Sequence, residues 1–295
     1  MTELANKQID LHTHSTESDG TLTPEALMRH AKEIGLSAIS LTDHDTIGGI
    51  AKARPIAEQL GLELVPGVEL STDYQEQEVH ILGYYFDESN PEFLAKLTEF
   101  VDGRDKRNEK MIRLLQQEGF DITMEALYAE NPDSVITRAH FGKYLVEHGF
   151  VKDRKTVFAK YLGDDCRCYV PREKITPFEA IKLIQMGGGL AFFAHPVLCH
   201  MNHDRLRDFT RRLKDAGLVG LEALYSKNSP ADEKNMQALA QEFDLLISGG
   251  SDFHGANKPE IHLGTGKGNL NIPYHILEEI KEYHSTGSAG TKTRS

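Results

Sequence analysis

Histidines and carboxylates gather in short motifs along this sequence, and these are residue types that bind divalent metal ions. His12 and His14 stand two residues apart, so on an extended segment both side chains point to the same side and reach one ion. A single histidine or Asp-His pair is more often structural, but here many such motifs occur together. Their conjunction predicts a metal site. The other motifs are Ser18-Asp19-Gly20, Thr42-Asp43-His44-Asp45, Pro66-Gly67-Val68-Glu69, the lone His80, Ala194-His195-Pro196 and Ser251-Asp252-Phe253-His254.

The elements expected around these motifs bring them together. Short apolar runs that favour strands alternate with amphipathic runs that favour helices, which indicates βαβ units and a parallel sheet or barrel. The carboxyl ends of barrel strands converge on one rim, where active sites are built, and each motif lies at or beside a strand end. Strands are expected over 8–11, 38–41, 62–65, 78–86, 190–194, 218–224 and 245–248. Helices are expected over 24–34, 47–60, 177–186, 205–216, 231–243 and 274–283.

A different pattern interrupts this alternation between residues 91 and 165. The stretch consists of long charged helical runs with no strand-like run between them. We therefore predict an α/β protein with a helical insertion subdomain. The expected organisation is a metal-binding barrel formed by 7–90 and 166–285, an insertion over 91–165 that caps the substrate, and a polar tail over 286–295.

Composition excludes several classes of protein. With 39% apolar and 26% charged residues in 295, the chain is neither collagen, coiled coil nor wholly disordered. It has no apolar run near the roughly 18 residues of a membrane span and no secretory signal, so no membrane association is expected. Cys166, Cys168 and Cys199 cannot form a disulfide framework, which favours the cytoplasm. A net charge of -12 argues against holding long nucleic acid on the outer surface. No obligate protein partner is evident.

The motif set resembles that of the PHP (polymerase and histidinol phosphatase) metallophosphoesterases, from about residue 8 to residue 270. Within that family, the helical insertion, Thr137-Arg138-Ala139-His140-Phe141 and Lys160-Tyr161-Leu162 resemble one branch. That branch contains the nucleoside 3′,5′-bisphosphate phosphatases and the related 5′-to-3′ exoribonucleases of RNase AM type. The resemblance implies a distorted (β/α)7 barrel that holds three divalent ions, with Mn²⁺ expected first and Fe or Zn as alternatives.

The resemblance also implies a role for each motif residue. It assigns the first ion to His12, His14, Glu69 and Asp252, the second to Glu69, His80 and His195, and the third to Asp19, His44 and His254. The nucleophile on phosphorus would be a metal-bridging hydroxide. The residues expected to serve catalysis are Asp19, His195, His254 and Asp43, the last by orienting ligands. Three divalent ions would outweigh the charges of the three carboxylate ligands, so an acidic protein would present a cationic pocket.

Candidate substrate-binding residues lie in the insertion and beyond the sixth strand. Arg104 and Arg107 are one helical turn apart and would clamp a second phosphate, unless they belong to a solvated charged face. Arg138 and His140 belong to the branch motif. Tyr225 would stack on a base or bond a phosphate, with ordinary packing at the rim as the alternative. Asn228 is the remaining candidate.

The substrate expected from these residues is a small nucleotide. The favoured reaction removes the 3′-phosphate from a nucleoside 3′,5′-bisphosphate. One alternative is 5′-to-3′ hydrolysis of short, single-stranded, 5′-phosphorylated oligonucleotides, which cuts the same 3′ P–O bond. A histidinol-phosphate phosphatase is a second alternative. The alternative outside the enzymes is a metal-stabilised interaction module.

Overall fold

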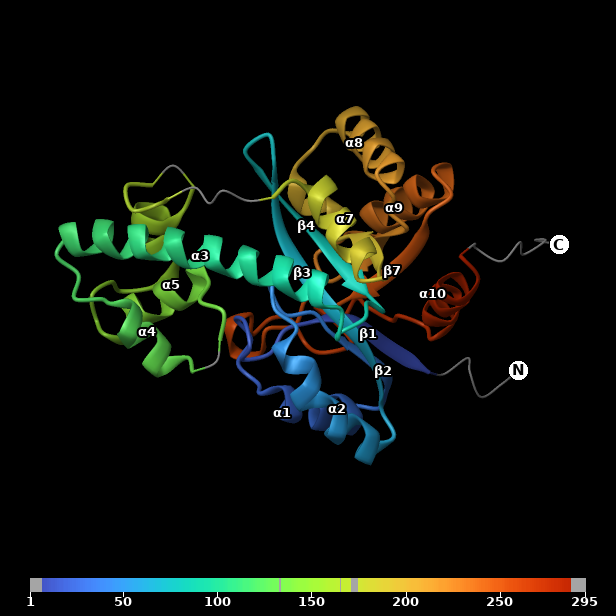
Figure 1. Ribbon diagram of the computed structural model, residues 1–295, viewed down its shortest axis with the longest axis horizontal. Coiled ribbons are helices and arrows are strands. Elements are labelled where there is room, and N and C mark those ends of the chain that lie inside the picture. Colours follow the sequence, from blue (N-terminus) through green and yellow to red (C-terminus); the bar gives the residue numbers. More distant parts are fainter. Residues whose placement is uncertain (1–6, 133, 165, 171–174, 288–295) are drawn as a thin grey trace.

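The computed structural model describes residues 7–132, 134–164, 166–170 and 175–287, and of residues 100–105 only the backbone. A sheet of seven strands has a spatial order that follows the chain. The sheet curls until β1 meets the segment after β7, where Asp252 N–H donates to His12 O and His14 N–H donates to Phe253 O, each at 2.9 Å. The sheet thus nearly closes into a barrel (Figure 1). Its strands are β1 (Gln8–Thr13), β2 (Leu36–Leu41), β3 (Glu63–Tyr74), β4 (Gln77–Tyr84), β5 (Leu190–Phe193), β6 (Gly220–Tyr225) and β7 (Leu246–Gly250).

Two expectations for this sheet are wrong, because the chain turns back directly after the third strand. β3 does not end at Val65, just before the motif of Glu69, but continues to Tyr74. β4 then pairs antiparallel with both β3 and β5, so the sheet is not wholly parallel. The turn between β3 and β4 holds Gln75 and Glu76 at φ values of 53° and 65°. Such turns usually carry Asn or Gly, so the sequence gives no hairpin signal here.

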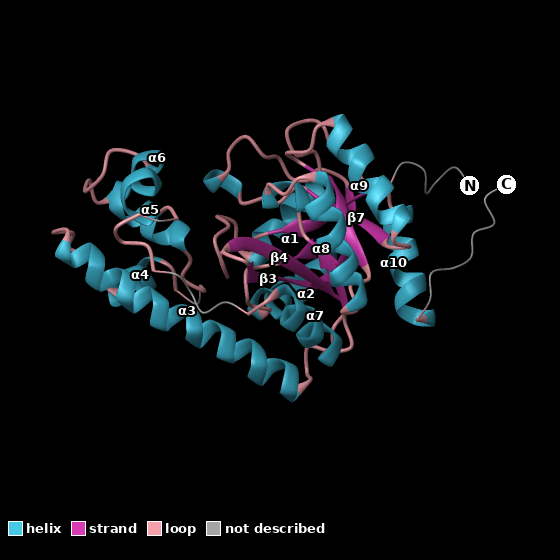
Figure 2. Cartoon of the chain, turned by 90° about the horizontal axis from the view of Figure 1, so that it is seen from above, coloured by secondary structure: helices cyan, strands magenta, loops and turns pink. Residues whose placement is uncertain are grey.

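The helices of the barrel's outer layer begin close to the residues that the sequence predicts. The side chain of Thr23 caps α1 (Pro24–Glu33) by accepting a hydrogen bond from Ala26 N–H, and Pro24 occupies the first turn. These helices lie around the outside of the strands (Figures 1 and 2). Thr286 and Gly287 close α10, and the rest of the predicted polar tail lies outside the described residues. The other helices of the layer are α2 (Gly48–Leu60), α7 (Pro177–Met186), α8 (His203–Asp215), α9 (Pro230–Glu242) and α10 (His275–Thr286).

The described residues between 91 and 162 form helices joined by loops and lie to one side of the barrel (Figures 1 and 2). Phe93 and Leu97, in the first turns of α3 (Pro91–Gln117), pack in the core of the barrel. Later residues of α3 pack in a separate core with α5 (Arg138–Glu147) and its neighbours. The same helix therefore belongs to two cores and joins the insertion to the barrel. The remaining elements are α4 (Met124–Glu130), α6 (Arg154–Val157) and the π-helix η1 (Phe158–Leu162).

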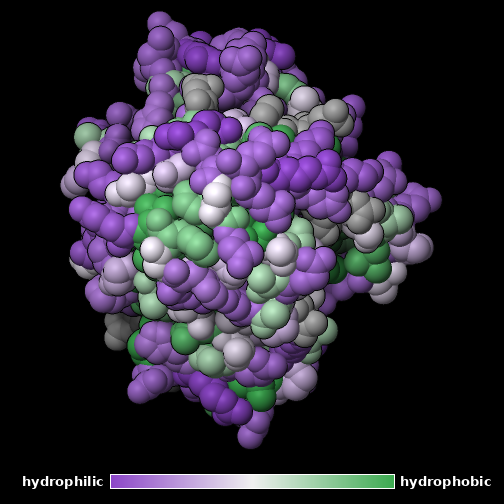
Figure 3. Space-filling model, turned by 90° about the vertical axis from the view of Figure 1, so that its left-hand side faces the viewer, coloured by the Kyte–Doolittle hydropathy of each residue, from purple (hydrophilic) through white to green (hydrophobic). Residues whose placement is uncertain are grey.

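The face of the molecule on the insertion side is mainly hydrophilic, with apolar atoms in smaller areas between the polar ones (Figure 3). Tyr128 and Phe150 are the large apolar side chains of the insertion that are exposed among the described residues. No helix in the described part of the chain is both long and apolar enough to span a membrane.

Candidate metal centre

The residues predicted as metal ligands meet at one rim of the barrel, around Glu69. Glu69 Oε2 lies 3.2 Å from both His12 Nε2 and His14 Nε2. Its other oxygen, Oε1, lies 2.8 Å from His80 Nδ1 and 2.9 Å from His195 Nε2. Oε2 also lies 3.2 Å from His44 Nδ1, so the two oxygens of one carboxylate lie among five histidines.

The antiparallel β3–β4 pair explains how His80 reaches this rim. Ser71 is paired with His80 and Glu69 with Leu82, so Glu69 and His80 lie on the same face of the hairpin. A parallel fourth strand would carry His80 in its early residues at the opposite end of the barrel. The reversal of β4 brings His80 beside Glu69.

Asp19 and Asp252 supply the carboxylates of the remaining clusters. Asp19 Oδ1 lies 3.2 Å from His254 Nε2 and 3.8 Å from His44 Nε2. Asp252 Oδ1 lies 3.3 Å from His14 Nε2. Two atoms that each lie about 2.1 Å from one ion are about 3 Å apart at the usual coordination angles. The separations of Asp19 from His254 and of Asp252 from His14 are close to that size, and that of Asp19 from His44 is larger.

Buried atoms at this rim fit a metal ion better than they fit one another. Among the described residues, those buried without a hydrogen-bond partner include His12 Nε2, His14 Nε2, Asp19 Oδ1, His44 Nδ1 and Glu69 Oε2. A buried polar atom without a partner is costly, and coordination to a cation removes that cost. The donor set of imidazole and carboxylate suits Mn, Fe and Zn.

The carboxylates at this rim are held ionised, whereas the histidines divide into two groups. Burial alone would raise the pKa of Glu69, but the charges of His12 and His80 hold it well below its usual range. Burial lowers the pKa of His44 well below its usual value, although Glu69 and Asp19 act in the opposite direction. Burial and the charge of His14 also lower the pKa of His254. Ionised carboxylates and neutral imidazoles are the forms that bind a metal ion. Burial alone would lower the pKa of His14 and of His80, but hydrogen bonds and charges of neighbouring carboxylates raise both to about 9, so these two rings lose a proton when they bind an ion.

Asp43 is not one of the residues whose ligand atoms cluster at the rim. Its carboxylate is buried and accepts hydrogen bonds from Ser15 N–H and Ser15 Oγ at 2.7 Å, and from Ser18 Oγ at 2.6 Å. These bonds hold the loop that presents Asp19. Asp43 therefore helps to position that loop.

Three predicted substrate residues make contacts within the protein. Tyr225 is fully buried, so no base reaches it in this structure, and its hydroxyl donates to Asp252 Oδ2 at 3.0 Å. His140 Nδ1 accepts a hydrogen bond from Thr137 N–H and so completes the capping box of α5. Asn228 is buried as well and donates to the Ala223 carbonyl.

Glu222 and Lys258 contact predicted ligands but belong to none of the sequence motifs. Glu222 lies in the middle of β6, fully buried, 3.0 Å from His12 Nδ1. Lys258 Nζ donates to Asp252 Oδ2 at 2.7 Å. A charged residue inside the apolar run Leu221-Glu222-Ala223-Leu224 is the signal that points to Glu222.

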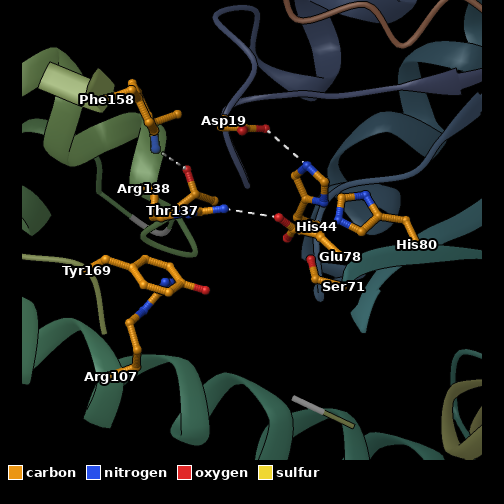
Figure 4. A pocket seen from close by; sticks show the side chains of 11 residues that line it. Asp19, His44, Ser71, Glu78, His80, Arg107, Thr137, Arg138, Phe158 and Tyr169 are labelled. Atoms are coloured by element: carbon orange, nitrogen blue, oxygen red, sulfur yellow. Dashed lines mark hydrogen bonds and ion pairs between the residues drawn. The ribbon is translucent and has the colours of Figure 1, made fainter. Parts of the chain in front are cut away.

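A cavity of about 190 Å³ opens between the candidate metal centre and the insertion (Figure 4). Asp19, His44 and His80 line it on the barrel side, and Arg107 and Arg138 line it on the insertion side. Ser71, Glu78, Thr137, Ala139, Phe158 and Tyr169 complete the lining. The side chain of Arg104 lies outside what the structure describes.

Arg138 is held between acidic side chains at the edge of this cavity. Its guanidinium donates to Glu78 Oε2 at 3.0 Å and to Asp164 Oδ1 at 2.8 Å, and it lies over the ring of Tyr169. Glu78 Oε1 in turn lies 3.3 Å from His80 Nε2. Glu78 therefore connects the insertion with the candidate metal centre.

Comparison with known proteins places the chain in a family. Residues 10–169 match the PHP domain. The chain belongs to the PHP family. It is a metal-dependent phosphoesterase, a hydrolase of phosphoric esters, and the branch predicted from the sequence is confirmed. A 5′-3′ exoribonuclease of Haemophilus influenzae is 36% identical over 248 residues, which cover 84% of this chain and 90% of that protein.

Two further relatives agree with this assignment. A 3′,5′-nucleoside bisphosphate phosphatase of Chromobacterium violaceum is 35% identical over 83% of this chain and 87% of its own length. A Bifidobacterium adolescentis protein described as a metal-dependent phosphoesterase has a solved structure with a TM-score of 0.82 and 30% identity. That match covers 94% of this chain and 96% of that one. The PHP barrel expected from the sequence is therefore confirmed, with the reversed fourth strand as its correction.

Proposed function

We propose that this PHP enzyme removes the 3′-phosphate from nucleoside 3′,5′-bisphosphates, giving a nucleoside 5′-monophosphate and inorganic phosphate. The observation that supports this substrate is the cavity in which Arg107 and Arg138 face the candidate metal ligands. A substrate with two phosphates needs a cationic group at each end of its site. A substrate with one phosphate, such as histidinol phosphate, has no use for the second.

The proposed ligands are those that cluster at the rim. His12, His14, Glu69 and Asp252 would hold one ion, Glu69, His80 and His195 a second, and Asp19, His44 and His254 a third, with Mn²⁺ as the first choice. Ions bound there would supply Lewis acidity toward the phosphoryl oxygens and lower the pKa of bound water. Asp43 would hold the loop of Asp19 in place during the reaction.

The insertion would hold the other end of the nucleotide. We assign the 5′-phosphate to Arg107 and Arg138, with Arg104 one turn along the same helix as a further candidate. Phe158 and Tyr169 line the same cavity and offer aromatic faces to the base. In this proposal residues 91–165 form the substrate cap of a barrel made of 7–90 and 166–285. The free thiols of all three cysteines favour the cytoplasm as its location.

A second cavity favours the exonuclease as the other candidate function. It measures about 540 Å³ and lies between the barrel and the insertion, lined by Glu17 and Gly20 on either side of Asp19 and by His140 of α5. Asp19 and Ala139 line the first cavity, so the two cavities adjoin along one loop and one helical turn. Hydroxyl and amide groups of Thr16, Thr21, Asn131, Ser134 and Asn257 line the second. An oligonucleotide with its 5′ end in the first cavity would place its next nucleotide there.

Product analysis tests both candidates. Mn-loaded protein is incubated with adenosine 3′,5′-bisphosphate and, separately, with a 5′-phosphorylated trinucleotide. We expect AMP and phosphate from the bisphosphate. Stepwise release of mononucleotides from the trinucleotide would show that the enzyme also has exonuclease activity. Failure to hydrolyse either substrate would refute the proposed function. Asp19→Asn should abolish turnover, whereas Asp204→Asn, a change of the same type on exposed α8, should leave it unchanged.

A further inference from the structure

Glu222 is a buried carboxylate with two well-defined hydrogen bonds, and both end on predicted metal ligands. Its side chain has no exposure to solvent. Oε1 lies 3.0 Å from His12 Nδ1, and Oε2 accepts a hydrogen bond from the backbone N–H of His195 at 2.8 Å. Both oxygens are thus engaged by donors and neither faces the ligand clusters, which distinguishes Glu222 from Glu69.

The bond to His12 fixes where the imidazole carries its proton. A carboxylate accepts a hydrogen bond from Nδ1–H, so the neutral ring keeps its hydrogen on Nδ1 and has a free electron pair on Nε2. Nε2 is the atom that lies 3.2 Å from Glu69 Oε2 in the candidate metal centre. Glu222 therefore selects the tautomer of His12 that can bind a metal ion through Nε2.

The bond to His195 holds an unusual backbone. His195 has φ of 27° and ψ of 63°, near the left-handed region that L-residues rarely adopt. This conformation follows directly after β5 and directs the ring so that Nε2 lies 2.9 Å from Glu69 Oε1. A fixed acceptor for the His195 N–H helps the fold keep that geometry.

We propose that Glu222 is a positioning residue that sets His12 and His195 together, and so couples two neighbouring metal sites through one carboxylate. The inference rests on the proposed function, because it takes His12 and His195 as ligands of the first and second ions. Glutamine cannot replace Glu222. Its single carbonyl oxygen accepts one of the two hydrogen bonds, and its NH₂ group then faces the other donor or the Nδ1 of the wrong tautomer.

Zinc binding and the histidine tautomers test this role without reference to turnover. Metal-free wild type, Glu222→Gln and Glu222→Asp are titrated with Zn²⁺ against a chromogenic chelator. Zn-loaded samples labelled with ¹⁵N-histidine are then examined by long-range ¹H–¹⁵N NMR, and His12→Asn assigns the His12 signal. Asp10→Asn is the control, because Asp10 is also fully buried and accepts hydrogen bonds from Ser251, Gly264 and the backbone N–H of His12, but does not touch a ligand ring.

In wild type we expect His12 to carry its proton on Nδ1. Glu222→Gln should lower zinc affinity 10- to 100-fold, the usual effect of losing such a partner, and displace the His12 signal. Glu222→Asp keeps two acceptor oxygens, so its zinc affinity should lie between those of wild type and Glu222→Gln. It replaces Glu222→Gln in the test if the amide variant does not fold. Asp10→Asn should lower thermal stability and leave the His12 tautomer unchanged.

Wild-type affinity and tautomer in Glu222→Gln would overturn the inference, and so would an equal loss of zinc affinity in Asp10→Asn. A wild type that binds no zinc would instead refute the ligand assignment on which the inference rests.

Discussion

Removing the guanidinium of Arg138 should cost the enzyme its recognition of the 5′-phosphate. In the structure this group makes hydrogen bonds of 3.0 Å and 2.8 Å to Glu78 and Asp164. The Glu78 and Asp164 side chains are 40% and 72% exposed, so both carboxylates can turn to water when a phosphate takes their place. When substrate binds, the guanidinium of Arg138 therefore exchanges carboxylate partners for a phosphate.

The expected effect is therefore that of about one charge-assisted hydrogen bond, about 1.5–3 kcal/mol. At 1.4 kcal/mol for each factor of ten, this corresponds to about a 10- to 150-fold fall in kcat/KM for the bisphosphate. Arg138→Met should leave kcat/KM for adenosine 3′-monophosphate within about twofold of wild type, because that substrate has no 5′-phosphate.

The assay measures phosphate release from adenosine 3′,5′-bisphosphate and adenosine 3′-monophosphate by wild type, Arg138→Met and Arg113→Met. Arg113 is a matched control, since its side chain is 70% exposed on α3 and pairs only with Glu109 in the same helix among the described residues. An equal fall on both substrates in Arg138→Met, or no fall on the bisphosphate, would refute the reasoning.

Three further predictions follow from the centre, the cysteines and the β3–β4 turn. Chelation should lower the melting temperature and abolish turnover, and Mn²⁺ at 100 times its Kd should restore about 2.7 kcal/mol of stability; a melting temperature insensitive to metal would argue against the centre. Burial raises the pKa of Cys199 to about 12 and that of Cys168 to about 11. Iodoacetamide at pH 8 should therefore modify Cys166 first in the native protein, and rapid modification of Cys199, read by mass spectrometry, would contradict this. Glu76→Gly should stabilise the fold by about 1 kcal/mol in urea denaturation, because Glu76 has φ of 65°, and an unchanged or lower midpoint would show that the turn is not strained.

The sequence predicts the parts of the fold that local chemistry controls. Thr23 and Pro24 start α1, and α7 spans Pro177–Met186 as expected, because a polar cap, a proline and an apolar stripe suffice to define a helix. The clustering of the histidine motifs also follows from position alone, since strand ends of a barrel meet at one rim.

Tertiary pairing decides the rest. A run such as 78–86 has the same alternation in either direction, so its reversal against β3 is not visible in the sequence. Tyr225 follows an expected strand end, where a residue at the rim would stand, but it is fully buried against Asp252. Glu222 makes hydrogen bonds to two partners that are 210 and 27 residues away along the chain. Such contacts form only in the folded barrel.

The pairing of β4 on both of its edges has a practical consequence at the tip of the hairpin. His80 keeps its place through β3 on one side, while Ile81 pairs with Phe193 of β5 on the other. The register of the ligand strand therefore does not depend on the length of the turn. His80 is three residues from the strand end at Gln77, about 10 Å along the strand. A spectroscopic label or a short inserted tag at Gln75 would thus report on substrate arrival from close by, while the ligand geometry stays as it is.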